Sequence, residues 1–260
     1  MFAKLLKMEF RSTWNILGIL CLSLVGAGLL GGLATRYLVN ADAVEGWPGV
    51  LCILTVVAVV LFFAVCAAAA LILQIVRFYR SRFTDEGYLT FTLPVGTHQI
   101  LLSSLVSSAV NLIAVAAVAL VSLALMGLCA IPSMEILKQG LSLIRQSLPA
   151  IWERVLQTEF LQALGLFLAN AVANFASELV LVMLAVTIGS LAAKKHKILA
   201  AVAFYYILHI AMYTVSGIAL AHLADTPEGV FGFWTVANLV IAVVGYFAAY
   251  WLVDRKLNLN

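Results

Sequence analysis

A row of polar side chains inside a long apolar stretch is the part of this sequence best suited to binding chemistry. Asn170, Asn174 and Glu178 follow one another at intervals of four residues, with Ser177 beside Glu178, so a helix would present them on one face. A carboxylate deep in a membrane costs about 2.5–3.5 kcal/mol on insertion scales, and such a group therefore faces protein or water. The row predicts a substrate or cation contact in a central cavity. The alternative is a hydrogen-bonded, structural role between helices.

Sequence patterns that would support catalysis within the chain are absent or incomplete. There is no G-x-x-x-x-G-K-[ST] phosphate loop for binding ATP, and there is no H-E-x-x-H helix for a catalytic zinc. Ser216 and Gly217, followed by His222, lack the full G-x-S-x-G elbow of a serine hydrolase. His209 and His222 have no zinc-ligand spacing and are expected to be structural. We therefore expect no catalytic residue, no metal site and no cofactor in this chain.

The overall composition indicates a membrane protein. The 260 residues are 64% hydrophobic and 10% charged, whereas ordinary soluble domains are roughly 45–50% apolar and about 25% charged. A spanning helix needs about 20 mostly apolar residues. Six stretches qualify, at roughly 14–35, 49–76, 99–130, 161–192, 198–222 and 230–253. The sequence thus predicts an all-α polytopic membrane protein with six transmembrane helices.

The distribution of Lys and Arg predicts the orientation of these spans. Six spans leave both termini on the same side, and cytoplasmic segments carry the excess of Lys and Arg. With the termini inside, the inner segments hold Lys4, Lys7, Arg11, Arg77, Arg80, Arg82, Lys194, Lys195, Lys197, Arg255 and Lys256, and the outer segments hold Arg36, Lys138, Arg145 and Arg154. We expect a multi-pass protein of the cytoplasmic membrane whose N- and C-termini are cytoplasmic.

The N-terminal segment 1–13 is predicted to be an amphipathic elbow helix in the inner interface, ahead of the spanning region 14–260. Lys4, Lys7 and Arg11 would share one helical face, and apolar residues would occupy the other. A simple positively charged flank is the alternative. In the first span that follows, small residues would allow close helix contact; they are Gly26, Gly28, Gly31 and Gly32.

A second amphipathic segment, 132–160, lies on the predicted outer side. Apolar residues recur at steps of four and three from Leu137 to Val155, which predicts a helix that is interrupted or kinked near Pro149. Such a segment either lies on the outer leaflet or caps a dimer.

The longest polar interruption on the inner side is the loop 77–98. It contains three arginines followed by the acidic pair Asp85 and Glu86, and a local ion pair between them is expected. Apolar residues between Tyr88 and Val95 would cover much of the surface of a short helix. Such a helix on a cytoplasmic loop needs a groove in which to lie, so the loop predicts a docking surface for a partner protein. A solvated turn is the alternative.

A family resemblance lies in the run Glu86-Gly87-Tyr88-Leu89-Thr90-Phe91-Thr92-Leu93-Pro94-Val95. It resembles the segment between the second and third spans of ABC transporter permeases of the type-2 exporter class, and is similar to stand-alone permease subunits of Gram-positive bacteria. That family shows an acidic residue, a glycine, spaced leucines and a proline followed by a small apolar residue. Six spans, an N-terminal elbow helix and inward-facing termini are similar to that family as well.

The resemblance implies the membrane-spanning permease subunit of an ATP-driven exporter. The loop would carry a cytoplasmic coupling helix that docks on separate ATPase subunits, which would bind the ATP and Mg. The implied coupling residues are Asp85, Glu86, Gly87, Tyr88, Leu89, Phe91, Leu93 and Pro94. A homodimer, or a heterodimer with a second permease, would form the pathway in the lipid membrane, and no nucleic acid is involved. The alternative is a non-transporting membrane scaffold or sensor that recruits a cytoplasmic partner.

Overall fold

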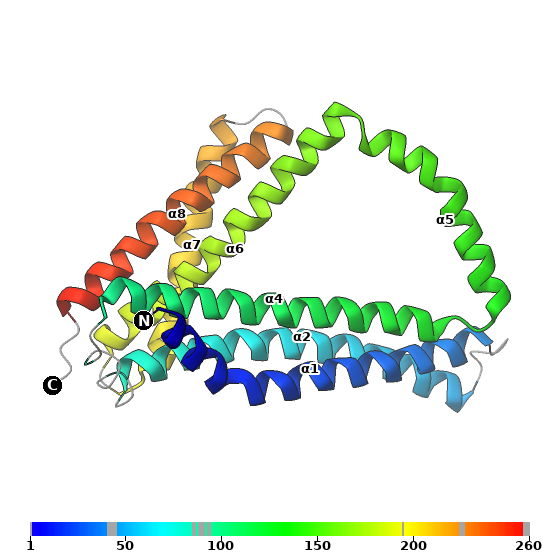
Figure 1. Cartoon of the computed structure of the whole chain (residues 1–260), viewed down its shortest axis with the longest axis horizontal. Coiled ribbons are helices and arrows are strands. Elements are labelled where there is room, and N and C mark those ends of the chain that lie inside the picture. The colour runs from blue at the N-terminus through cyan, green and yellow to red at the C-terminus, as the bar shows by residue number, and fades with distance from the viewer. Residues whose placement is uncertain are drawn as a thin grey trace. The chain divides into compact units, whose positions relative to one another are not determined.

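The structure, a computed structural model, describes residues 2–40, 46–84, 87, 92, 95–193, 195–223 and 227–256. Within these residues the chain is all-helical (Figure 1), and the helices are α1 (Phe2–Asn40), α2 (Trp47–Phe83), α4 (Thr97–Ala130), α5 (Met134–Val155), α6 (Thr158–Ala192), α7 (Lys197–Leu223) and α8 (Pro227–Lys256). Every one of them except α5 is long and apolar enough to cross a membrane. The all-α class is therefore confirmed for the described residues, and six helices have the length and apolar composition of the predicted spans.

Several helices continue well beyond the apolar stretches that predicted them. Residues 2–13 form the first turns of α1, so they are helical, and their location at a membrane interface stays a prediction. α2 runs to Phe83 and contains all three arginines that we expected in the loop 77–98. Arg is a good helix former, and positive charge near a helix C-terminus is favourable, which explains the extension. The 37 residues of α2 span about 55 Å at 1.5 Å per residue, more than a hydrocarbon core requires.

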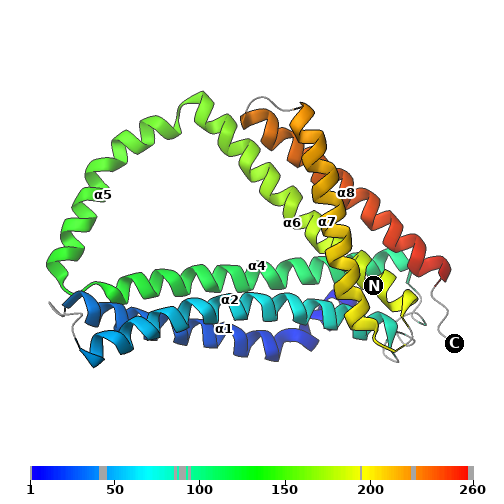
Figure 2. The same ribbon diagram turned by 180° about the vertical axis from the view of Figure 1, so that it is seen from behind.

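The chain forms two compact units. Unit 1 comprises Met1–Phe10, Leu73–Ala109 and Leu156–Asn260, and unit 2 comprises Arg11–Ile72 and Val110–Val155. In unit 1, α6 packs against both α7 and α8, and the three helices lie side by side in Figures 1 and 2. The buried core of this unit includes Phe78, Leu101, Met183, Val186 and Ala249.

In unit 2, the parts of α1, α2 and α4 that belong to it run alongside one another (Figures 1 and 2). Their buried core includes Leu17, Leu24, Cys66, Ala70 and Val115. All of these residues face inward from long apolar helices, whereas many other apolar side chains on the same helices are exposed. That exposure is expected of helices whose outer faces meet lipid.

The close approach of α1 to α4 in unit 2 depends on glycine. An added Cβ at Gly28 would lie 2.6 Å from the carbonyl oxygen of Ser122, and one at Gly32 would lie 2.7 Å from that of Met126. A Cβ at Gly26 would meet nothing within 4 Å. The sequence therefore identified the contact correctly at Gly28 and Gly32, and Gly31 is also closely packed, but Gly26 is not part of it.

Helix α5 is amphipathic in sequence, and none of its residues is buried. Ser133 lies just before it and accepts a hydrogen bond from the backbone N–H of Ile136 at 3.4 Å, as an N-cap residue does. The helix continues through Pro149 without a break, so an interruption there is wrong, whereas the alternative, a kink near Pro149, stays a prediction. The exposed surroundings let water or lipid head groups satisfy the carbonyl group that proline leaves unpaired. The last residues of the predicted segment 132–160 belong to α6.

Alanine at Gly28 or Gly32 is expected to lower the thermal stability of the detergent-solubilised protein, because the new Cβ would overlap a carbonyl oxygen of α4. Overpacking of this kind costs about 1–3 kcal/mol, whereas alanine gains about 1 kcal/mol over glycine in a helix. Gly26→Ala is the matched control and should be neutral or slightly stabilising. Equal unfolding midpoints for Gly26→Ala and Gly28→Ala would contradict the close contact.

The predicted orientation can be tested by cysteine labelling in a background in which Cys21, Cys52, Cys66 and Cys129 are replaced by alanine. Gln139→Cys on α5 should react with a membrane-impermeant maleimide on intact cells, because we expect it outside. Lys195→Cys, between α6 and α7, should react only after permeabilisation. The opposite pattern would reverse the topology.

Candidate functional site

Most of the implied coupling residues lie outside the described part of the chain; they are Asp85, Glu86, Tyr88, Leu89, Phe91, Leu93 and Pro94. Gly87 is described and is buried. Its backbone N–H donates to the carbonyl oxygen of Thr84 at 2.7 Å, and a Cβ at this position would collide with the carbonyl oxygen of Arg82. Packing thus explains why the run that follows α2 has a glycine here.

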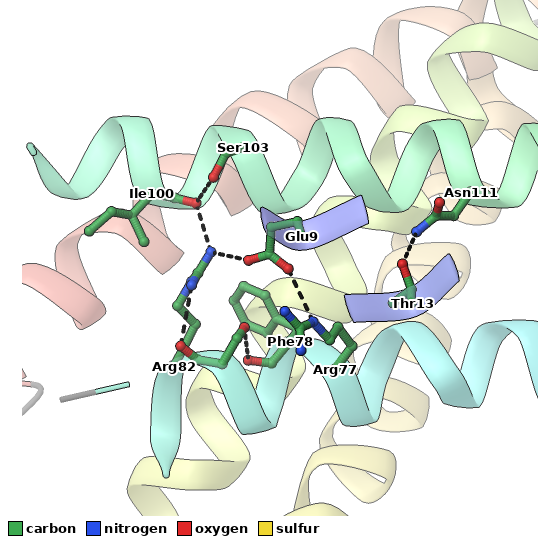
Figure 3. Close-up of polar contacts among 9 residues, drawn as sticks. Glu9, Thr13, Arg77, Phe78, Arg82, Ile100, Ser103 and Asn111 are labelled. Atoms are coloured by element: carbon green, nitrogen blue, oxygen red, sulfur yellow. Dashed lines mark hydrogen bonds and ion pairs between the residues drawn. The ribbon is translucent and has the colours of Figure 1, made fainter. Parts of the chain in front are cut away.

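A buried ion pair fixes the last turn of α2 directly before this segment (Figure 3). The side chain of Arg82 is fully buried. Its Nη2 donates to Oε1 of Glu9 at 2.9 Å and to the carbonyl oxygen of Ile100 at 3.0 Å. The same carbonyl oxygen accepts a hydrogen bond from the hydroxyl of Ser103. One guanidinium group therefore joins the first turns of α1, the last turn of α2 and the first turn of α4.

Glu9 is shared between two arginines. Glu9 is 2% exposed, and the second oxygen of its carboxylate, Oε2, lies 3.2 Å from Nε of Arg77. Burying charges is costly, and a buried pair persists because each charge satisfies the other, so removing one partner is strongly destabilising. The carboxylate of Glu9 is held by hydrogen bonds from two positive groups, which makes it the centre of this cluster.

Two of the arginines have a partner that the sequence analysis did not identify. The sequence predicted a local pair with Asp85 and Glu86, and since both lie outside the described residues that pair stays a prediction. The structure pairs Arg77 and Arg82 with Glu9, which lies 68 and 73 residues earlier in the chain. Glu9 was missed, although it is the only acidic residue before Asp42 and stands among basic neighbours. A single acidic residue among basic ones could have indicated that Glu9 pairs with a basic side chain.

The other end of the segment is held by α8. Thr97 begins α4, and its hydroxyl donates to Oδ1 of Asp254 at 3.1 Å. The ring of His98 stacks on Tyr250 with centroids 3.8 Å apart, and its Nδ1 lies 3.1 Å from the hydroxyl of Tyr246. Residues 84–96 therefore start and finish at points that unit 1 holds in place.

Part of the predicted polar row of α6 faces α8. The buried hydroxyl of Ser177 lies 2.8 Å from the carbonyl oxygen of Asn174 and 3.2 Å from Oδ1 of Asn238 on α8. Nδ2 of Asn238 in turn lies 3.5 Å from Oδ1 of Asn170. Asn238 was not a candidate residue in the sequence analysis, although its side chain contacts two that were, Asn170 and Ser177.

Glu178 faces a different helix. Its Oε2 accepts a hydrogen bond from the hydroxyl of Tyr205 on α7 at 2.9 Å, and its Oε1 lies 3.5 Å from Nδ1 of His209. The expected single face is thus divided between α7 and α8. An α-helix turns about 100° per residue, so each four-residue step drifts by about 40°. Asn170 and Ser177, seven residues apart, remain nearly aligned, whereas Glu178 is rotated away from them.

The Glu178 contact continues into a column of rings. The ring centroids of Tyr205 and His209 lie 5.5 Å apart, those of His209 and Tyr213 4.4 Å, and those of Tyr213 and Trp234 on α8 5.4 Å. Among the described residues no group of three or more His, Cys, Asp or Glu side chains is placed to hold a metal ion. The chemistry that this cluster offers is one carboxylate beside electron-rich rings.

Comparison of the chain with protein-family models, with curated proteins and with solved structures finds no match. The functional argument therefore rests on the sequence run 86–95 and on the contacts of the described residues.

Replacing Arg82 by Met is expected to lower the free energy of unfolding by about 3–5 kcal/mol, because Glu9 would lose its most buried partner. The double variant Glu9→Leu/Arg82→Met should recover part of that loss, since the two most buried charges are both removed. Arg77, whose side chain is 18% exposed, would still lose its contact with Glu9. Arg80→Met is the control on the same helix; its side chain is exposed, and the change should stay within about 0.5 kcal/mol. Chemical denaturation in detergent measures all of these. A double variant as unstable as Arg82→Met would argue against the pairing.

Proposed function

We propose that this chain is the membrane-spanning permease subunit of an ATP-driven exporter of the ABC type-2 class, coupled to separate ATPase subunits through residues 83–96. The resemblance of the run 86–95 and the six candidate spans support this proposal. The absence of a phosphate loop from the sequence agrees with ATP hydrolysis in another subunit.

The observation that carries the coupling part of the proposal is the buried hydrogen bonding of Arg82. If a partner displaced an exposed loop, the loop could change conformation without moving the helices. A segment that begins beside a buried guanidinium group with hydrogen bonds to two other helices would instead move those helices with it. The partners of Arg82 in those two helices are Glu9 on α1 and the backbone of Ile100 on α4.

A displacement at the Arg82 cluster would reach unit 2 because the same helices continue into it. α1, α2 and α4 each continue from unit 1 into unit 2, changing unit between residues 10 and 11, 72 and 73, and 109 and 110. The Arg82 cluster ties the three helices together on the unit 1 side. A displacement of residues 83–96 would therefore be imposed on three helices at once, as alternating access requires.

In this proposal the pathway lies within a homodimer or a heterodimer with a second permease, and the polar row of α6 contributes contacts to it. ATP and Mg are bound by the ATPase subunits, and the inner loop is their docking surface. The termini and the loop face the cytoplasm, in agreement with the distribution of Lys and Arg.

The test replaces Glu86 or Leu89 by alanine and measures two quantities: the amount of ATPase that co-purifies with the chain, and its ATP hydrolysis in reconstituted vesicles. Loss of a central contact in a docking surface should weaken association by at least about tenfold. Membrane insertion should be unchanged. Glu135→Ala, on exposed α5, is the matched control and should behave as the unaltered protein does.

Normal co-purification and hydrolysis in both loop variants would contradict the proposal. A partner that binds through the loop but hydrolyses no ATP would instead favour the scaffold or sensor.

A further inference from the structure

The surroundings of Glu178 leave part of its carboxylate unsatisfied. Glu178 lies well inside α6, and His209 lies near the middle of the candidate span Lys197–Ile218. One oxygen, Oε2, accepts the hydrogen bond of Tyr205. The other, Oε1, accepts no hydrogen bond from the described residues, and Nδ1 of His209, 3.5 Å away, is buried and makes none. A carboxylate with a free oxygen at this depth is costly unless a positive group comes to it.

The carboxylate is also accessible. The side chain of Glu178 is 28% exposed and that of His209 is 32% exposed. This exposure means that a group from outside the chain can approach the carboxylate.

Aromatic rings extend from this carboxylate along one side of α7. Tyr205, His209 and Tyr213 follow at intervals of four residues, and their rings lie in succession before Trp234 on α8. Tyr213 is 40% exposed. The faces of Tyr and Trp rings attract cations, and the attraction strengthens where water is excluded.

We propose that Glu178 and the rings of Tyr205, Tyr213 and Trp234 form a binding site for lipophilic organic cations. The carboxylate provides the opposite charge, and the rings provide contact for the apolar body of the ligand. The inference that such cations are the exported molecules rests on the proposed function. Binding of a cation at this site requires no ATPase and can be tested separately.

The local chemistry disfavours other ligand classes. Between Lys197 and Arg255 the sequence contains no Lys or Arg, and α6 contains none at all, so an anion would meet the charge of Glu178 without a basic partner. A metal ion would need several ligating side chains, and the described residues hold no such group. A neutral apolar molecule would leave the carboxylate without a counter-charge.

The experiment compares tetraphenylphosphonium with tetraphenylborate, which have nearly the same size and shape and opposite charge. Equilibrium binding is measured with purified, nucleotide-free protein in nanodiscs of phosphatidylcholine, and empty nanodiscs correct for partition into lipid. The inference requires saturable binding of the phosphonium and none of the borate. This comparison uses the unaltered protein, so it does not depend on the folding of any variant.

Two substitutions then locate the site. Glu178→Gln keeps an acceptor for Tyr205 but removes the charge, and it should weaken phosphonium binding by about tenfold or more. Tyr213→Leu removes one ring and should weaken it by roughly three- to tenfold. The matched controls are Glu159→Gln in the first turn of the same helix and Tyr37→Leu on α1, both exposed, and neither should change binding.

Equal binding of the two ions, or phosphonium binding that Glu178→Gln leaves unchanged, would overturn the inference. Either result would assign Glu178 to a structural contact with Tyr205 and His209. Phosphonium binding that persists while Glu86→Ala and Leu89→Ala leave ATPase association normal would refute the proposed coupling and retain this site.

Discussion

The hydrogen bonds of Arg82 to Glu9 and to the backbone of Ile100 are the interaction on which the packing of α1, α2 and α4 in unit 1 depends. In a chain that is 10% charged, a fully buried guanidinium group is costly. Nη1 and Nη2 of Arg82 offset that cost by hydrogen bonds to Ser81, Glu9 and Ile100, whereas its Nε makes none with the described residues. Arg82 lies in the last turn of α2, directly before the segment that we propose for coupling. The same bonds stabilise three helices and set where that segment begins.

The helices were largely predictable because their information is local. Apolar composition and length identified all six candidate spans, and a four–three repeat identified α5. Helix ends were less predictable, since α2 takes in Arg77, Arg80 and Arg82 by propensity and by favourable charge at its C-terminus. Pro149 was expected to interrupt or kink α5. It does not interrupt the helix, because an exposed helix tolerates the carbonyl group that proline leaves unpaired.

The candidate sites were only partly predictable because they are made by pairs of helices. Asn170, Ser177 and Glu178 were identified from their polarity, but their partners Asn238, Tyr205 and His209 lie on α7 and α8, and spacing on one helix contains no information about them. Glu9 was missed for the same reason, as its arginines lie far along the chain. The polar row does not share one face because four residues exceed one helical turn, so each four-residue step rotates the side chain slightly. Two such steps, from Asn170 to Glu178, double the rotation.

The glycine contact between α1 and α4 has a thermodynamic consequence. Packing between long side chains freezes rotamers, at a cost of about 0.5–2 kcal/mol for each large side chain. At Gly28 and Gly32 the first helix has no side chain to immobilise, and its backbone lies directly against that of α4. The separation of these helices is therefore set by hard contact between main chains and should vary little with temperature or with the lipid around them.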